Sequence, residues 1–150
     1  MRRGQVSLDF LFAVTLIAIT MLNIAYIANI ETGHARTFDI TTRLKIFSVD
    51  VRDTVVKGYS VGDGFKIKKE SPIPLKSDSD SIVITLIDPG DLIKVTAVIE
   101  GKTYTTYQKS PVPIYATSSV VLKRGQEEFW IVATYNEKEG KLYVTLQASS

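Results

Sequence analysis

Residues 10–30 read FLFAVTLIAITMLNIAYIANI, a run without a charged side chain. A helix of about 20 apolar residues is long enough to cross the hydrocarbon core of a bilayer. The polar members of the run are Thr15, Thr20, Asn23 and Asn29, which fall on several helix faces and form no single polar stripe. Because lipid or other helices must surround a helix that is apolar all round, the run predicts a membrane-spanning or helix-packed segment.

The flanking charges predict the orientation of this segment. Arg2 and Arg3 precede the run and Glu31 follows it. Since positive residues stay on the cytoplasmic side, the N-terminus is expected in the cytoplasm and everything after about residue 31 outside. A cleavable secretory signal has an apolar core of roughly 7 to 15 residues, which is shorter than this run. Hydropathy alone therefore predicts a single-pass membrane anchor that carries an outward-facing domain.

The residues before the run form a second pattern, RRGQVSLD at 2–9, in which an acidic residue immediately precedes the apolar helix. An anchor explains the two arginines but gives no reason for Asp9. The stretch Gly4–Asp9, followed by an apolar helix, resembles the class III signal peptide of type IV pilins, most closely the archaeal subfamily with the motif Q-x-S-x-E-x-x-x-L. Two positions differ, because the acid is Asp9 and the leucine position holds Ala13.

The resemblance implies that a prepilin peptidase cuts between Gly4 and Gln5 and leaves the apolar run on the mature protein. It also implies further partners, namely a pilus assembly ATPase, a polytopic platform protein and other copies of the chain in a homopolymeric filament. An archaeal source is implied as well. The residues that would form the processing motif are Arg2, Arg3, Gln5, Ser7 and Asp9.

The chemistry of the cut gives Asp9 a role. Cleavage creates a new ammonium group on Gln5, and a carboxylate four residues on lies one helical turn away or within reach of a neighbouring subunit's amine. A buried ion pair is a weak source of stability but a credible device for setting register. Cleavage also removes Arg2 and Arg3 from the 18 Lys and Arg, so 18 − 2 = 16 remain against 16 Asp and Glu.

An amphipathic helix is expected over residues 32–58. One face carries Ile40, Leu44, Phe47, Val51 and Val55 at spacings of three and four, and a thinner stripe of Phe38, Val49 and Val56 lies on the opposite side. The first stripe can hold the helix to its own domain and the second can face neighbouring subunits. Lys57-Gly58 predicts the helix end, and Gly33 predicts a soft point around residues 31–37.

From residue 59 the apolar period changes to two, which predicts a β-rich head. Glu100-Gly101-Lys102 and residues 136–140 are predicted hairpin turns, and residues 88–91 a tight turn. The sequence thus predicts an α+β fold, with the long helix packed on an antiparallel β-sheet or small β-sandwich. The predicted strands are Phe65–Lys69, Ile82–Ile87, Leu92–Glu100, Thr103–Gln108, Ser119–Leu122, Phe129–Tyr135 and Leu142–Gln147. The domain boundaries follow as a leader at 1–4, a transmembrane or filament-core helix at 5–31, a helical extension at 32–58 and a head at 59–150.

Other chemistry has little support in the sequence. There is no cysteine, His34 is the one histidine, and phosphate-binding and nucleophile-elbow motifs are absent, so no enzyme, cofactor or metal site is predicted. The near balance of charge predicts no nucleic-acid partner. Residues 78–81, Asp-Ser-Asp-Ser, are read as a solvated loop in preference to a Ca²⁺ site. Tyr104, Tyr107 and Tyr115 are read either as an adhesive surface or as ordinary packing.

The sequence therefore predicts a structural subunit of an extracellular, type IV pilus-like filament that serves adhesion to surfaces. The precursor would sit in the membrane with its head outside before it enters the filament. One alternative is an unassembled, membrane-anchored extracellular binding protein. Another is a minor subunit of a related archaeal filament machine.

Overall fold

The computed structural model describes the backbone of residues 2–149 and the side chains of residues 8–149. One helix, α1 (Arg2–Val61), precedes seven strands, and the chain divides after Asp39 into two compact units. The second unit, from Ile40 onward, contains the last part of α1 and all the strands and is called the head below. The strands are β1 (Lys66–Glu70), β2 (Ser81–Ile87), β3 (Leu92–Ile99), β4 (Lys102–Lys109), β5 (Ser118–Lys123), β6 (Glu128–Asn136) and β7 (Lys141–Ala148).

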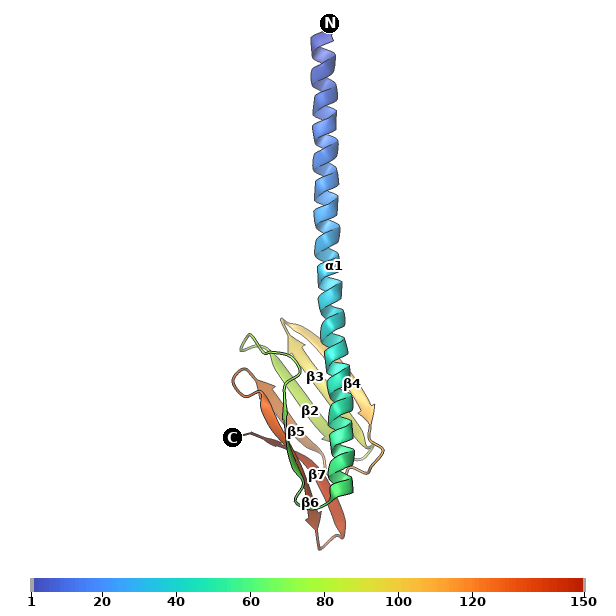
Figure 1. The fold of residues 1–150 in the computed structure, drawn as a ribbon, viewed down its shortest axis with the longest axis vertical. Coiled ribbons are helices and arrows are strands. Elements are labelled where there is room, and N and C mark those ends of the chain that lie inside the picture. The colour runs from blue at the N-terminus through green and yellow to red at the C-terminus, as the bar shows by residue number, and fades with distance from the viewer. Residues whose placement is uncertain (1, 150) are drawn as a thin grey trace. The chain divides into compact units, whose positions relative to one another are not determined.

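Two antiparallel sheets build the head, with strand orders β1-β6-β7 and β4-β3-β2-β5 (Figure 1). Strands β2, β3 and β4 form a meander, and β5 returns to pair with the other side of β2. The seven predicted strands are confirmed, with every end within one residue of its prediction. The α+β class, one long helix with antiparallel sheets, is confirmed too.

The core of the head lies between the sheets and the last part of α1. In β2 and β3 alternate residues are buried, as expected of strands with one face on a core. The predicted helix stripe joins them, and the Phe47 and Phe129 rings meet edge to face with centroids 6.2 Å apart. The stripe residues are all buried, namely Ile40, Leu44, Phe47, Val51 and Val55.

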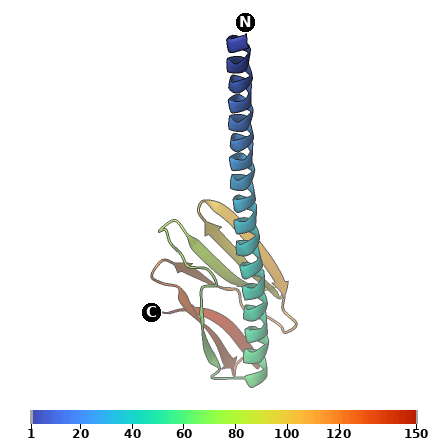
Figure 2. The same ribbon diagram turned by 45° about the horizontal axis from the view of Figure 1, so that its top comes forward.

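Hydrogen bonds tie the helix to the outer strand of each sheet. From β4, the Gln108 amide donates to Ser48 Oγ at 3.2 Å. From β1, Lys69 Nζ donates to the Asp50 carboxylate at 2.8 Å. Figure 2 shows this last part of α1 running alongside the sheets of the head, with β4 beside it. The helix is therefore held at the β4 edge of one sheet and at the β1 edge of the other.

The helix ends later than the sequence predicts. Lys57-Gly58 was expected to end it, but α1 continues to Val61 and is followed by Gly62, whose φ is 95°. That conformation suits the glycine just after a helix. Gly58 serves packing instead, because a Cβ there would lie 2.9 Å from Cδ1 of the buried Phe65 ring.

We expect Gly58→Ala to destabilise the head by about 1–3 kcal/mol, because overpacking against Phe65 outweighs a helix-propensity gain of about 1 kcal/mol. Thermal unfolding of the full chain in non-ionic micelles, followed by circular dichroism, measures the change. Gly33→Ala is the matched control, since a Cβ there would have nothing within 4 Å. An unfolding midpoint for Gly58→Ala equal to or above that of the wild type contradicts this explanation.

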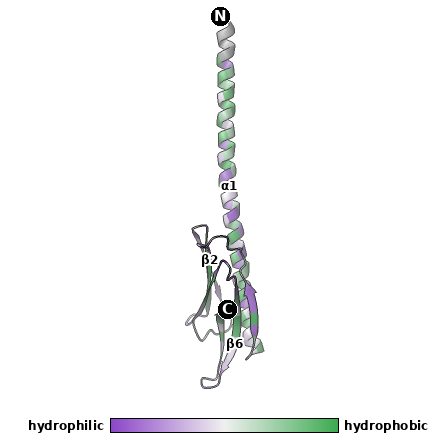
Figure 3. Ribbon diagram, turned by 90° about the vertical axis from the view of Figure 1, so that its left-hand side faces the viewer, coloured by the Kyte–Doolittle hydropathy of each residue, from purple (hydrophilic) through white to green (hydrophobic). Residues whose placement is uncertain are grey.

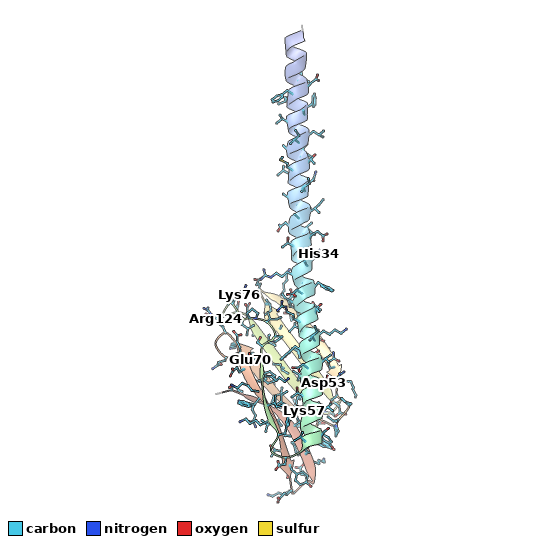
Figure 4. All side chains as sticks on the ribbon, in the orientation of Figure 1. His34, Asp53, Lys57, Glu70, Lys76 and Arg124 are labelled. Carbon is cyan, nitrogen blue, oxygen red and sulfur yellow. The ribbon has the colours of Figure 1, made fainter. Side chains whose placement is uncertain are left out.

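Asp80 organises the loop that leads from β1 to β2. Its side chain is 2% exposed, and its carboxylate accepts hydrogen bonds from the backbone N–H groups of Lys76, Ser77 and Glu100, at 3.2, 3.0 and 3.0 Å. The prediction of a solvated loop at 78–81 is therefore wrong for Asp80, whose carboxylate is buried and bound by backbone. Asp78 is exposed, and Arg124 Nη1 lies 3.5 Å from its Oδ1. Figure 4 labels Arg124 and Lys76 at this end of the head.

Candidate membrane and assembly site

Exposed apolar side chains cover the first part of α1. From Leu8 to Ile30 the large apolar residues are between 40% and 71% exposed, and none of the most apolar 18-residue window is buried by the rest of the chain. Figure 3 shows hydrophobic residues predominating along this part of the helix. The protein thus has one N-terminal helix that is long and apolar enough to cross a membrane, as the sequence predicts.

Most hydroxyl groups of this helix bond to its own backbone. Thr15, Thr20 and Thr32 each donate to the carbonyl four residues earlier, all at 2.8 Å. Such bonds let a threonine sit in an apolar environment without an unpaired donor. The amides of Asn23 and Asn29 are exposed and make no hydrogen bond within the described part of the chain.

Asp9 is exposed on α1 and is the one charged residue between Leu8 and Ile30. The side chains of Arg2, Arg3, Gln5 and Ser7 lie outside the described residues, and at the predicted cleavage site between Gly4 and Gln5 only the helical backbone is described. The processing motif and the pairing of Asp9 with the Gln5 amine therefore stay predictions from the sequence.

The helix continues without a break through residues 31–37, where a soft point was expected. Gly33 is helical, and no other group approaches it closely enough to require a glycine. His34 is exposed there (Figure 4). One glycine costs only about 1 kcal/mol in a helix, which the long flanking helical segments outweigh.

The second stripe of the helix faces solvent only in part. Phe38 is 74% exposed, whereas Val49 and Val56 are half-buried. Sequence reasoning missed Ile46, which is 65% exposed and lies three residues before Val49, next to it on the helix surface. The spacing i, i+3 was visible in the sequence, and it would have added Ile46 to this stripe.

The three tyrosines considered in the sequence have different surroundings. Tyr104 is partly buried against the core, and Tyr107 is 56% exposed with Lys94 Nζ 5.8 Å from its ring centroid. Tyr115 packs against Tyr143 at 6.0 Å between ring centroids. Packing therefore describes Tyr104 and Tyr115, whereas Tyr107 is exposed.

Within residues 8–149, no group of three or more His, Cys, Asp or Glu side chains is placed to hold a metal ion. Comparisons of the chain with protein-family models, curated proteins and solved structures find no match. The arrangement of the described residues is that of an N-terminal helix suited to lipid or to other helices, and a head with its own closed core.

Proposed function

We propose that this protein is a structural subunit of an extracellular filament of the type IV pilus kind, used for attachment to surfaces. A prepilin peptidase would cut between Gly4 and Gln5, and the mature chain would assemble through its N-terminal helix. The head would form the outer surface of the filament. An assembly ATPase and a platform protein are the further partners that the motif implies.

The observation that carries this proposal is the contrast between the two parts of the chain. The head buries most of its large apolar residues within itself, with Val51, Ile84 and Ile131 at 0% exposure. The helix before residue 31 exposes nearly all of its apolar residues. Neighbouring helices are as apolar as lipid tails, so a move from bilayer to filament exchanges one apolar environment for another. The head needs no partner for its core, whereas the helix before residue 31 needs lipid or other helices along its whole length.

The position of Asp9 favours a filament subunit over a simple anchor. Water and headgroups can solvate Asp9 at the membrane surface, but among the packed helices of a filament a carboxylate is costly unless it is paired, and cleavage at Gly4 supplies an ammonium group one turn away on each copy. An anchor that keeps Arg2 and Arg3 has no such amine near Asp9. The pairing of Asp9 with a neighbouring copy's Gln5 amine would neutralise both charges and fix the register between helices.

We expect intact-mass analysis of the protein from sheared surface filaments to find Gln5 as the first residue. The motif at Gly4-Gln5 predicts this first residue, because a cut there removes residues 1–4 and leaves the apolar run on the mature chain. The same protein from a strain without its prepilin peptidase is the control and should begin before Gly4. A mature chain that retains Arg2 would refute the proposal and favour the membrane-anchored binding protein. The amount of the chain in the filaments separates a major from a minor subunit.

A further inference from the structure

The geometry points to a self-association seam on the N-terminal helix, in which Asn23 hydrogen-bonds to Asn23 of a second copy within the membrane. The seam consists of Ala13, Leu16, Thr20, Asn23, Ile27 and Ile30. This inference rests on the proposed insertion of the helix into a membrane. It requires neither cleavage nor a filament, and it names a contact that forms before assembly.

Asn23 and Asn29 are the two side-chain amides of the run, and within the described residues the helix leaves both of them unpaired. The hydroxyls of Thr15 and Thr20 already bond to backbone carbonyls at 2.8 Å, whereas the Asn23 amide has no partner among the described residues. An amide in an apolar medium without a hydrogen bond costs several kcal/mol on cyclohexane scales. The exposed amide of Asn23 therefore requires a partner from outside its own chain.

Depth distinguishes Asn23 from the other asparagine. At about 1.5 Å per residue, Asn23 lies about 10 Å inside the outer end of the run at Ile30. Its short side chain does not reach the headgroups from that depth. Asn29 is next to Ile30 and two residues before Glu31, so its amide reaches the polar interface. Water or headgroups can satisfy Asn29, whereas only protein can satisfy Asn23.

The neighbours of Asn23 form a surface that a second helix can approach. The seam residues recur at alternating spacings of three and four, so they lie along one face, as in helices that pack side by side. Small side chains at Ala13 and Thr20 allow the backbones to come close. All six seam side chains are exposed. Asn29 lies about 120° around the helix from Asn23, away from the seam.

A second copy of the same chain is the occupant that fits this surface. An amide carries both a donor and an acceptor, so two identical asparagines can satisfy each other. Two copies inserted by the same positive-inside rule run parallel, and the Asn23 pair holds them in register. In that register Asp9 of each copy lies at the cytoplasmic end of the seam, where water and headgroups can solvate it.

Disulfide cross-linking of the full chain in bilayer vesicles tests the seam, and the absence of cysteine from the natural sequence gives a clean background. Ile27→Cys, on the seam, should form dimers under mild oxidation. Ala25→Cys, at nearly the same depth but on the opposite face, should form few. Adding Asn23→Leu to Ile27→Cys should weaken dimerisation roughly five- to thirtyfold, as expected for one interhelical hydrogen bond.

Three controls make the result decisive. Asn29→Leu should leave the dimer unchanged, and Asn23→Gln, which keeps the amide, should retain most of it. Equal dimer from Ala25→Cys, no effect of Asn23→Leu, or an equal loss with Asn29→Leu overturns the seam. Extraction of the chain by alkaline carbonate, measured first, would overturn membrane insertion and the seam with it. Failure to find cleaved Gln5 termini would refute the filament and leave the seam standing.

Discussion

Asp9→Ala is expected to leave cleavage at Gly4 largely intact and to reduce incorporation into filaments roughly a hundredfold or more. The proposed scissile bond follows Gly4, five residues before Asp9, so a prepilin peptidase would still cut there. The mature chain then carries an unpaired ammonium group on Gln5 among apolar helices. Removal of one partner from a buried pair costs about 3–5 kcal/mol, which is the origin of the large factor.

The measurement is the ratio of cleaved chain in the membrane to chain in sheared filaments, by quantitative mass spectrometry. Asp9→Glu keeps the charge and matches the acid of the pilin motif, so filaments should return. Asp9→Asn keeps the shape without the charge and should resemble the alanine variant. Normal filaments from Asp9→Ala would show that the acid does not set the register, even if processing at Gly4-Gln5 proves correct.

Asp80→Ala is expected to destabilise the head by about 3 kcal/mol or more. The substitution leaves the N–H groups of Lys76, Ser77 and Glu100 without their acceptor. Hydrogen bonds to a charged group contribute about 1.5–3 kcal/mol each, and Asp80 accepts three of them from a buried position. Unfolding in guanidinium, followed by circular dichroism in non-ionic micelles, measures the loss.

Asp78→Ala is the matched control for this prediction. Its carboxylate is exposed and lies 3.5 Å from Arg124, so its removal should change stability by less than about 1 kcal/mol. Asp80→Asn retains one carbonyl acceptor but places an NH₂ group against backbone donors, and it should also destabilise the head. Equal stabilities of the Asp78→Ala and Asp80→Ala variants would mean that the Asp80 hydrogen bonds do not hold this loop.

Local pattern predicted the elements of this fold well. Alternation of apolar and polar residues located β2 and β3, because a strand with one face on a core needs a period of two. The spacing of Leu44, Phe47 and Val51 located the buried side of the helix, because residues three and four apart lie on the same helix face. Both patterns follow from the backbone geometry of a single element, so neighbouring residues contain the whole signal.

The two serine-proline loops show where local pattern helped only in part. They carry Ser-Pro-Ile-Pro at 71–74 and Ser-Pro-Val-Pro at 110–113, and the structure gives both the same turn. Ser71 Oγ donates to the carbonyl of Ile73 at 2.6 Å, and Ser110 Oγ donates to that of Val112 at 2.7 Å. The similar sequences did not indicate that one loop leads from one sheet to the other, while the second stays within one sheet.

The sequence by itself determined the apolar helix, the strands and the candidate cleavage motif, since each depends on residues that are close along the chain. Only the tertiary structure decided that the helix continues past Gly58, that Asp80 is buried, and that Ile46 is exposed. Those outcomes depend on contacts made outside a single helix or strand, or on their absence, such as the Phe65 ring on Gly58 and the Glu100 N–H on Asp80. Contacts of that kind leave no periodic signal in the sequence, because their partners are brought together only when the sheets and the helix pack.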